Sequence, residues 1–293
     1  MKYTIEEFRK EYPNDAACLD KLFKMRFGNL EACPCCGVAE PKFNRITTRR
    51  SYQCRDCYYQ IYPTAGTIFE KTTTPLNYWF YAMFLMTTTR NGVAAKELER
   101  ALGVTYKTAW RMAKLLRDLM GFTNTTSKLK GQVEMDETYV NHGKKDKTIG
   151  RSSRNQSPVF GMVERNGNVR AFALENVKKN IIFPLIKKHI DASANISTDE
   201  YPLYTNIEPE LGIKHGSIKH ALKQYRDGSI STNTIEGFFS QLKRSINGTY
   251  LHASKKHIAG YVSECVFRYN NRKNQSQMFE NFINQIKVPV LKN

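Results

Sequence analysis

Four cysteines fall into two closely spaced pairs. Cys33 and Cys36 form the first pair, Cys54 and Cys57 form the second, and seventeen residues lie between the pairs. Each C-x-x-C pair can offer two thiolates from one tight turn, and four thiolates complete a tetrahedron around Zn²⁺ with no open position. Reduced core cysteines or a redox pair are the alternative, but two pairs at matched spacing favour the metal. The sequence predicts one structural zinc site.

A second set of candidate residues is acidic. Asp136, Asp199 and Glu236 could converge at one edge of a sheet, where their carboxylates would hold two Mg²⁺ ions about 4 Å apart for phosphodiester cleavage. Lys243 follows Glu236 by seven residues, so it shares a helix face with Glu236 and could contact a phosphate. In a chain with 27 acidic residues, any three can be picked out and most are solvated, so spacing alone leaves this site open.

The elements that must position these carboxylates can be read from periodicity. From residue 131 the pattern alternates with period two, which puts Val133 and Met135 on the face opposite Asp136. Two further strand-like runs, 157–164 and 168–175, bracket Asn166-Gly167, a strong hairpin signal. We then expect a helix over 178–190, a short strand over 195–198 and helices over 234–246 and 254–271, with Thr232 or Asn233 and Ser254 as N-caps. This order predicts a mixed α+β layer fold.

A helical pair lies between the cysteines and the carboxylates. Residues 92–114 contain a helix, a turn at Gly103 and a second helix from Thr105, which is the layout of a helix-turn-helix. We expect Tyr106, Lys107 and Arg111 to face outward toward a DNA groove. Helical hairpins with a glycine turn also occur in proteins that never touch DNA, so the motif alone does not decide its function.

The charge balance favours a polyanionic partner. Lys and Arg number 45 against 27 Asp and Glu, which leaves a formal charge of +18 on 293 residues. No apolar run approaches the ~18 to 20 residues needed to cross a bilayer, and the acidic start of the chain is unlike a secretory signal. We therefore expect an intracellular protein that handles DNA, with no membrane partner.

Several short segments carry a resemblance that spans nearly the full length. The chain resembles a bacterial insertion-sequence transposase that joins an N-terminal zinc ribbon to a DDE catalytic domain with the RNase H-like fold. The segments that carry it follow the order of that family: 12–18 (YPNDAAC), 33–37 (CPCCG), 66–69 (GTIF), 135–139 (MDETY), 198–199 (TD), 233–239 (NTIEGFF), 248–250 (GTY) and 267–270 (FRYN).

The resemblance implies roles for individual residues. Asp136 is expected to bridge both metal ions, and Asp199 and Glu236 each to complete one. Because some members use Asn as the third ligand, Asn233 is an alternative to Glu236. Lys243 is the basic residue that follows the acidic one, and we expect it to contact DNA together with Arg244. Many relatives carry His where this chain has Ser231, so no histidine role is expected there.

The resemblance also implies cofactors and domains. One structural Zn²⁺ and two catalytic Mg²⁺ or Mn²⁺ ions are expected. The α+β multidomain chain would divide into an N-terminal helical segment (1–30), a zinc ribbon (31–70), a helix-turn-helix region (71–127), an RNase H-like mixed-sheet catalytic domain flanked by helices (128–250) and a C-terminal helical segment (251–293).

The expected function is DNA transposition. The protein would bind the terminal inverted repeats of its own element, free 3′-OH ends and transfer them to target DNA, as a homodimer or larger assembly on DNA in the bacterial cytoplasm, associated with the nucleoid. Two alternatives remain: a non-catalytic zinc-ribbon and helix-turn-helix regulator, or an RNase H-like nuclease without strand transfer.

Overall fold

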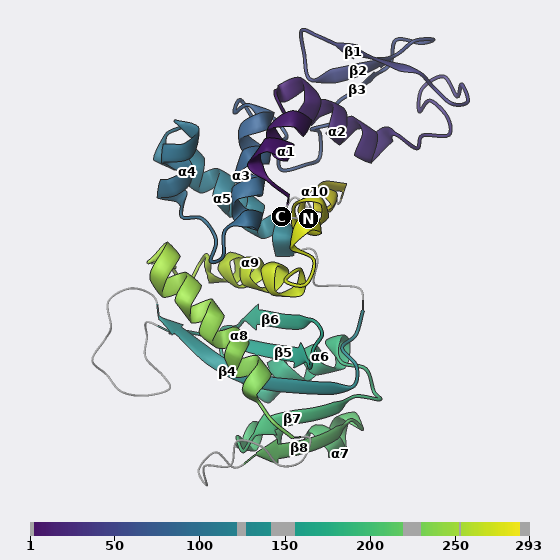
Figure 1. Cartoon of the computed structure of the whole chain (residues 1–293). Helices are drawn as coiled ribbons and strands as arrows, with labels where there is room; N and C mark the ends of the chain where they lie inside the picture. Colours follow the sequence, from purple (N-terminus) through teal and green to yellow (C-terminus); the bar gives the residue numbers. More distant parts are fainter. Residues whose placement is uncertain (1–2, 122–126, 142–155, 219–229, 252, 288–293) are drawn as a thin grey trace. The chain divides into compact units, whose positions relative to one another are not determined.

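The chain gathers into two compact units. A computed structural model describes residues 3–121, 127–141, 156–218, 230–251 and 253–287 (Figure 1). Unit 1 comprises Met1–Thr89, Ala95–Leu119 and Asn274–Asn293, and unit 2 comprises Arg90–Ala94 and Met120–Lys273. The five segments expected from the sequence are distributed over these two units, and their boundaries stay predictions.

Unit 1 begins with two short helices and a small sheet. Helix α1 (Ile5–Glu11) starts with a capping box between Thr4 and Glu7, and α2 (Asp15–Phe27) is capped by the side chain of Asn14. Strands β1 (Phe43–Ile46), β2 (Ser51–Cys54) and β3 (Gln60–Ile61) form an antiparallel sheet in that order. This sheet and the cysteine pairs confirm the predicted zinc ribbon.

The remaining helices of unit 1 supply its core. They are α3 (Leu76–Thr88), α4 (Ala95–Leu102), α5 (Tyr106–Met120) and α10 (Met278–Asn284). Helix α3 contains no charged residue, and its Trp79, Phe80 and Met83 are fully buried. Phe279 of α10 packs against Phe8 of α1, so the last helix contributes to a core built mainly by the first third of the chain. Short 3₁₀ turns flank α10 at Gln275–Gln277 and Gln285–Lys287.

Unit 2 is built on a five-stranded mixed sheet. Its strands are β4 (Gln132–Asn141), β5 (Gln156–Glu164), β6 (Val169–Ala173), β7 (Asn195–Asp199) and β8 (Lys214–Ile218), in the spatial order β6-β5-β4-β7-β8. The β4–β5 and β5–β6 pairs are antiparallel, whereas β4–β7 and β7–β8 are parallel. This order confirms the predicted RNase H-like mixed sheet. The predicted hairpin is also confirmed, because Asn166 has a φ of 62° in the β5–β6 turn.

Helices cover both faces of this sheet. Helix α6 (Lys179–His189) packs on the face that carries Val133 and Met135, with α7 (Ile207–Leu211) and a 3₁₀ turn at Pro202–Tyr204 at its margin. The other face is covered by α8 (Asn233–Arg244), the π-helical turn η4 (Ser245–Tyr250) and α9 (Ile258–Asn270), as Figure 1 shows. The alternation predicted around Asp136 is therefore confirmed, since residues 133 and 135 lie on the opposite face.

Two predicted helix limits were wrong. The helix expected over 234–246 changes from α to π geometry after Arg244, because η4 inserts a wider turn. The helix expected from Ser254 begins at Ile258, because Ser254 starts a turn in which its carbonyl accepts the N–H of His257 (2.9 Å). Thr232 does occupy the N-cap position of α8, but its side chain does not cap the helix. Strand β8 and helix α7 were not anticipated.

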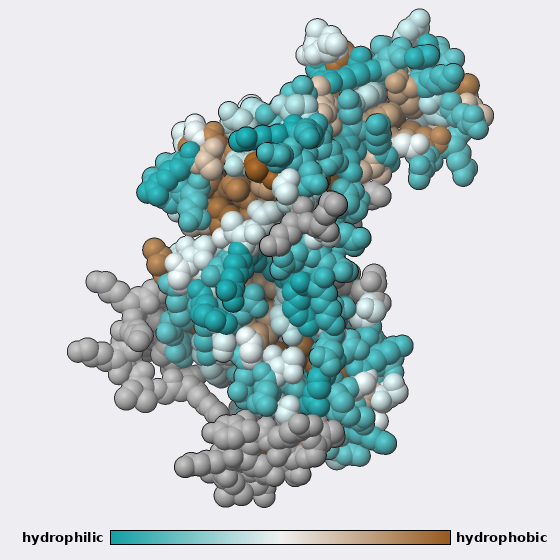
Figure 2. Space-filling model, in the orientation of Figure 1, coloured by the Kyte–Doolittle hydropathy of each residue, from teal (hydrophilic) through white to brown (hydrophobic). Residues whose placement is uncertain are grey.

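The visible surface is dominated by polar side chains, in keeping with the basic composition (Figure 2). Within the described residues, no helix is both long and apolar enough to traverse a lipid bilayer.

Candidate active site and zinc centre

The four predicted cysteines meet at one point in the zinc ribbon. Their sulfur atoms all lie within 4.8 Å of one another, and the Sγ atoms of Cys33 and Cys57 are 3.8 Å apart. A tetrahedron with Zn–S bonds of ~2.3 Å has edges of ~3.8 Å, so the spacing fits zinc. Cys35 is exposed and does not belong to this group. The geometry therefore accords with a structural zinc site closed by Cys33, Cys36, Cys54 and Cys57.

Each cysteine pair sits in a turn of the same shape. The carbonyl of Cys33 accepts the N–H of Gly37 (3.0 Å), and the carbonyl of Cys54 accepts the N–H of Tyr58 (3.2 Å). Gly37 and Tyr58 both have positive φ, 72° and 63°. The backbone N–H groups of Cys36 and Cys35 point toward the first sulfur and lower the pKa of Cys33, which favours the thiolate form that binds metal.

Two of the predicted carboxylates line one cavity. Asp136 lies in the middle of β4 and Asp199 at the end of β7. These strands pair in parallel through Glu134 and Ser197, and the same register continued by two residues brings Asp136 level with Asp199. Both line a cavity of about 500 Å³ that also includes Lys243 of α8 and Asn247 of η4.

The electrostatics of Asp136 reveal a concentration of negative charge. Burial is the main cause that raises the pKa of Asp136 to about 7, and the charges of Glu137, Asp199 and Glu236 raise it further. A hydrogen bond from the N–H of Glu137 (2.7 Å) acts in the opposite direction. A divalent cation would neutralise the charge of a half-buried carboxyl that has three other carboxyls around it. These oxygen ligands therefore fit Mg²⁺ or Mn²⁺.

The third predicted ligand lies apart from this cavity lining. Glu236 is exposed on the first turn of α8, where its Oε1 accepts the hydroxyl of Thr232 (2.9 Å), and it is not among the residues that line the cavity. Asn233, the first residue of α8, is also exposed and outside the lining. Among the described residues, the four cysteines are the one group of three or more His, Cys, Asp or Glu residues whose ligand atoms are placed to hold a metal ion.

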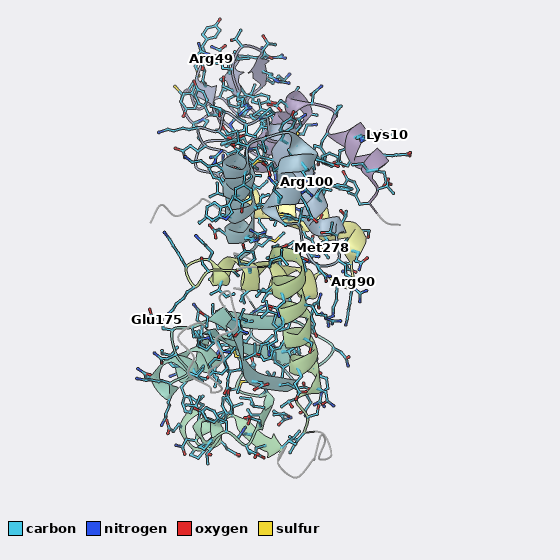
Figure 3. All side chains as sticks on the ribbon, turned by 90° about the vertical axis from the view of Figure 1, so that its left-hand side faces the viewer. Lys10, Arg49, Arg90, Arg100, Glu175 and Met278 are labelled. Atoms are coloured by element: carbon cyan, nitrogen blue, oxygen red, sulfur yellow. The ribbon has the colours of Figure 1, made fainter. Side chains whose placement is uncertain are left out.

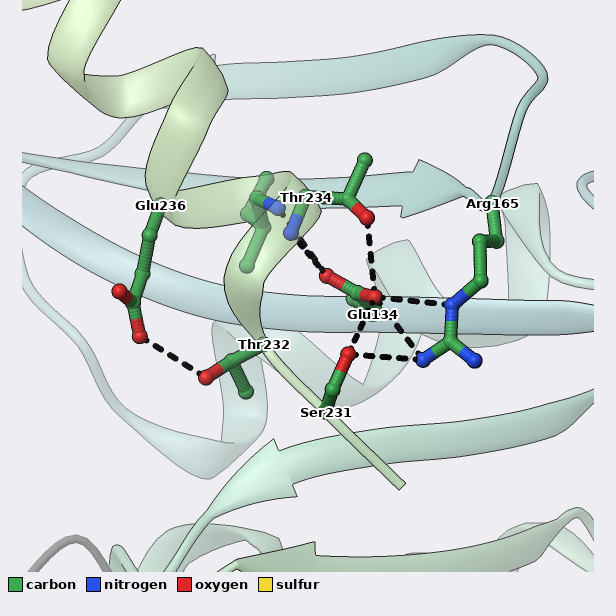
Figure 4. A network of polar contacts seen from close by, with 7 residues as sticks. Glu134, Arg165, Ser231, Thr232, Thr234 and Glu236 are labelled. Carbon is green, nitrogen blue, oxygen red and sulfur yellow. Dashed lines mark hydrogen bonds and ion pairs between the residues drawn. The ribbon is translucent and has the colours of Figure 1, made fainter. Parts of the chain in front are cut away.

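Glu134 anchors the helix that carries Glu236 and Lys243 (Figure 4). Its side chain is fully buried, and its Oε2 accepts the N–H groups of Thr234 (2.6 Å) and Ile235 (3.1 Å) at the start of α8. Its Oε1 accepts the hydroxyls of Thr234 and Ser231 (3.0 Å each) and forms an ion pair with Arg165 (2.9 Å). A strand carboxylate thus caps a helix a hundred residues later, and it does so on the same strand as Asp136.

Close packing of α8 on the sheet depends on a glycine. Gly161 of β5 pairs with Asp136 across the sheet. A methyl group at this position would lie 2.8 Å from Ile235 Cδ1 and 2.9 Å from Phe239 Cζ, both of α8. The absence of a side chain at Gly161 therefore lets α8 approach the sheet beside Asp136.

Sequence reasoning missed three residues of this region. Glu137 lines the cavity and accepts the hydroxyl of Tyr204 (2.5 Å), and Asn247 lines it from η4. The four-residue step from Lys243 to Asn247 was a readable signal, because residues at that spacing share a helix face. The capping role of Glu134 had no local signal, since its partners on α8 lie far away in the sequence.

The predicted DNA-contacting residues are exposed. Tyr106 is 51% exposed, and Lys107 and Arg111 are exposed on α5. Arg111 also lies over the ring of Trp79, 5.6 Å from its centroid. Gly103 has a φ of 63°, as expected for the turn between α4 and α5. Arg244 is exposed near the end of α8, where its Nε donates to the carbonyl of Ser240 (3.3 Å).

Two family models match the chain. Residues 128–270 match the ISXO2-like transposase domain, and residues 13–60 match the transposase zinc-ribbon domain. The chain thus carries both domains of an insertion-element transposase. The first match covers the sheet, α8 and α9, and the second covers α2 and most of the ribbon, so both units of the transposase carry a recognised domain.

A curated relative supports this assignment. The transposase is 23% identical over 269 residues to an uncharacterized protein in transposable element ISH50 of Halobacterium salinarum, covering 86% of this chain and 90% of the relative.

Among solved structures, similarity is found to a simian T-cell lymphotropic virus intasome in complex with PP2A regulatory subunit B56 gamma (13% identity, TM-score 0.32, 68% of this chain and 73% of that chain). It is also found to the Mos1 strand transfer complex (10% identity, TM-score 0.25, 69% and 77%). At TM-scores this low, the fold assignment rests on the strand order of unit 2.

Proposed function

We propose that this transposase binds the terminal inverted repeats of its own element, cleaves phosphodiester bonds to free 3′-OH ends and transfers them to target DNA. The observation that carries the proposal is the shared cavity of Asp136, Asp199 and Lys243 within the transposase domain. Two acidic groups beside a basic one can hold cations and a phosphate at the same place.

Each side chain has a defined role in this proposal. Asp136 and Asp199, with Glu236 or Asn233 as the third ligand, would hold two Mg²⁺ or Mn²⁺ ions. When bound, these ions supply Lewis-acid activation of the nucleophile and stabilisation of the leaving oxygen. Lys243 binds a phosphate of the cleaved strand. Glu134 holds α8 against β4 and so fixes the separation between the strand ligands and the helix ligands.

The rest of the molecule serves to hold DNA. The charge of +18 supports tight, salt-dependent contact with phosphates. Tyr106, Lys107 and Arg111 would contact the terminal repeat, and Arg244 the DNA beside the cavity. Because two ends must be joined to one target, the active form would be a homodimer or larger assembly on DNA, working on the nucleoid in the cytoplasm.

The test is metal-dependent nicking of a terminal-repeat duplex by the purified, zinc-loaded protein. Wild type should nick with Mg²⁺ or Mn²⁺, and Asp136→Ala and Asp199→Ala should each reduce nicking at least 1,000-fold, on the order of the loss expected for a catalytic metal ligand. Glu210→Gln is a matched control, because Glu210 is an exposed acid that pairs with Lys179 and is not among the residues that line the cavity. Activity that survives both alanine variants would reject the site.

The two alternatives give different results. A wild-type protein that binds the duplex but never nicks it would favour a non-catalytic regulator. A protein that nicks but cannot join a pre-cut 3′-OH end to target DNA would be a nuclease without strand transfer. Comparing Glu236→Gln with Asn233→Ala decides the third ligand, because the true ligand should cause the larger loss.

A further inference from the structure

One residue of the zinc ribbon keeps a strained backbone while exposing its ring. Tyr58 has a φ of 63° and is 70% exposed. The first cysteine turn uses Gly37 (φ 72°) at the equivalent position, which is the residue that this conformation favours. Packing does not account for a tyrosine here, because most of its side chain lies in solvent. The strain therefore points to a function of the exposed ring.

Tyr58 lies beside a row of amide side chains on the ribbon sheet. Asn44, Gln53 and Gln60 face one another across β1, β2 and β3. On the opposite face, Tyr52 is buried and stacks on Phe23 of α2, with ring centroids 3.9 Å apart. One face of the sheet is thus packed against α2, and the other presents three amides.

Aromatic and basic groups border this amide row. The side-chain amide of Gln53 donates to the carbonyl of Tyr58 (3.1 Å), and the hydroxyl of Tyr62 donates to the Gln60 side chain (2.9 Å). Tyr62 is 44% exposed. At the other end of the row, Arg55 donates to Asn44 (2.9 Å). The base-reading face defined by these six residues therefore combines two exposed rings, three amides and a guanidinium.

The surroundings of this face favour an anionic partner. Residues 42–62 contain five basic residues and one acidic residue. Lys42, Arg45, Arg49 and Arg55 are exposed, and Figure 3 labels Arg49 in the turn between β1 and β2. Arg50 is only partly exposed and pairs with Asp15 (2.8 Å), and Arg45 lies 3.9 Å from Asp20.

We propose that the base-reading face binds unpaired DNA bases. Tyr58 and Tyr62 would stack on base faces, the amides would hydrogen-bond base edges, and Arg55 would contact a phosphate. An unpaired base is the specific partner, because stacking needs a base face that paired neighbours do not cover. This inference rests on the proposed function, which makes DNA the substrate. It adds that the ribbon binds a single-stranded segment at the end of the element.

The test compares three fluorescent DNAs by anisotropy with the full-length, zinc-loaded protein. They are a blunt terminal-repeat duplex, the same duplex with a single-stranded tail and the free single strand. Wild type should prefer the tailed duplex to the blunt one. Tyr58→Gly should lower affinity for the tailed duplex and the single strand about 5-fold or more, the usual loss for one stacking ring. The same variant should melt at the same or a higher temperature, because glycine accepts positive φ without strain.

The controls separate stacking from folding. Tyr58→Phe keeps the ring and should retain the tail preference. If Tyr58→Gly binds the tailed duplex as tightly as wild type, the proposal is wrong. If it weakens blunt and tailed duplexes equally, the face contacts paired DNA and the assignment to unpaired bases is wrong. Nicking of the blunt duplex tests the catalytic proposal separately, so either one can fail while the other stands.

Discussion

At Asp136, the proposed catalysis and the stability of the fold make opposite demands. The folded protein holds this carboxyl in a half-buried position beside three others, which raises its pKa from 3.8 to about 7. An acid whose pKa is raised by folding is easier to protonate in the folded state. Its ionised form therefore destabilises the fold, with no effect below pH 3.8 and the full effect above pH 7.

We expect Asp136→Asn to stabilise the protein in the absence of Mg²⁺ and Mn²⁺ and to abolish nicking. The rise in pKa to about 7 corresponds to an upper bound of about 4 kcal/mol at ~1.4 kcal/mol per pH unit. In buffer without Mg²⁺ or Mn²⁺ at pH 8, thermal melts of the zinc-loaded proteins should show a higher melting temperature for the variant, and the gain should vanish as the pH falls toward 4. A gain that is independent of pH would show that removing the charge is not its cause.

At the residue scale, the sequence pointed to candidate site residues more readily than to the residues that hold those side chains and helices in place. Residue type and spacing pointed to Asp136, Asp199 and Lys243, which line one cavity, and to the four cysteines, which cluster separately, whereas Glu236 and Asn233 lie outside the cavity lining. Glu134 could not be assigned a role, since its partners are Arg165 in a hairpin turn and residues 231–235 before and within the first turn of α8, all distant in the chain. The capping role of its buried charge can be recognised only in the folded structure.

Among the elements, α8 is held by the strand rather than by its own N-cap. Thr232 directs its hydroxyl to Glu236, so the first N–H groups of the helix depend on Glu134. The result is a helix whose placement is tied to the strand that carries Asp136.

We expect Glu134→Gln to cost about 3 kcal/mol of unfolding free energy, because an amide in its place removes the buried charge that pairs with Arg165 and accepts the first N–H groups of α8. Urea denaturation measures the loss. Glu210→Gln should change stability by less than about 0.5 kcal/mol, since that ion pair is exposed. Equal losses for the two variants would refute the anchoring role of Glu134.

A second element-scale prediction concerns the contact between α8 and β5. Gly161→Ala should push α8 away from Asp136 and reduce nicking at least 10-fold, because its methyl group would clash with Ile235 and Phe239. Gly237→Ala, in the same helix with nothing within 4 Å, should leave nicking intact and stabilise by about 0.5 to 1 kcal/mol. Nicking rates and melting temperatures of the two variants test this prediction. A Gly161→Ala variant that nicks as fast as wild type would contradict it.

Elements with strong periodicity were predictable, and weakly patterned ones were not. The β5–β6 hairpin follows from Asn166-Gly167 and its alternating flanks. Strand β8 (Lys214–Ile218) carries His215, Gly216 and Ser217 in place of alternating apolar residues, and it forms because β7 offers a parallel edge. Thr198 of β7 adds a hydrogen bond to His215 (2.9 Å) across that edge.

On the scale of the whole molecule, the zinc cysteines and the candidate catalytic residues reside in different units. The zinc cysteines belong to unit 1, whereas Asp136 and Asp199 belong to unit 2. We expect Cys54→Ser to release zinc and unfold residues 31–65 while the sheet of unit 2 keeps its hydrogen-exchange protection. Cys35→Ser is the control, because this exposed cysteine lies outside the ligand group and should leave zinc content unchanged. Loss of protection in β4 of Cys54→Ser would contradict the independence of the units.

Unit 1 is built from segments that lie far apart in the sequence, and this has a consequence for protein synthesis. Phe279 packs beside Phe8, and Glu280 pairs with Lys21, so residues near both ends of the chain complete one core. A ribosome delivers these late residues only after all of unit 2 has been made. The nascent chain therefore lacks a finished unit 1 until α10 has been made. Gene copies that lose the codons for α10 would yield a protein whose unit 2 is whole but whose zinc-bearing unit cannot close its core.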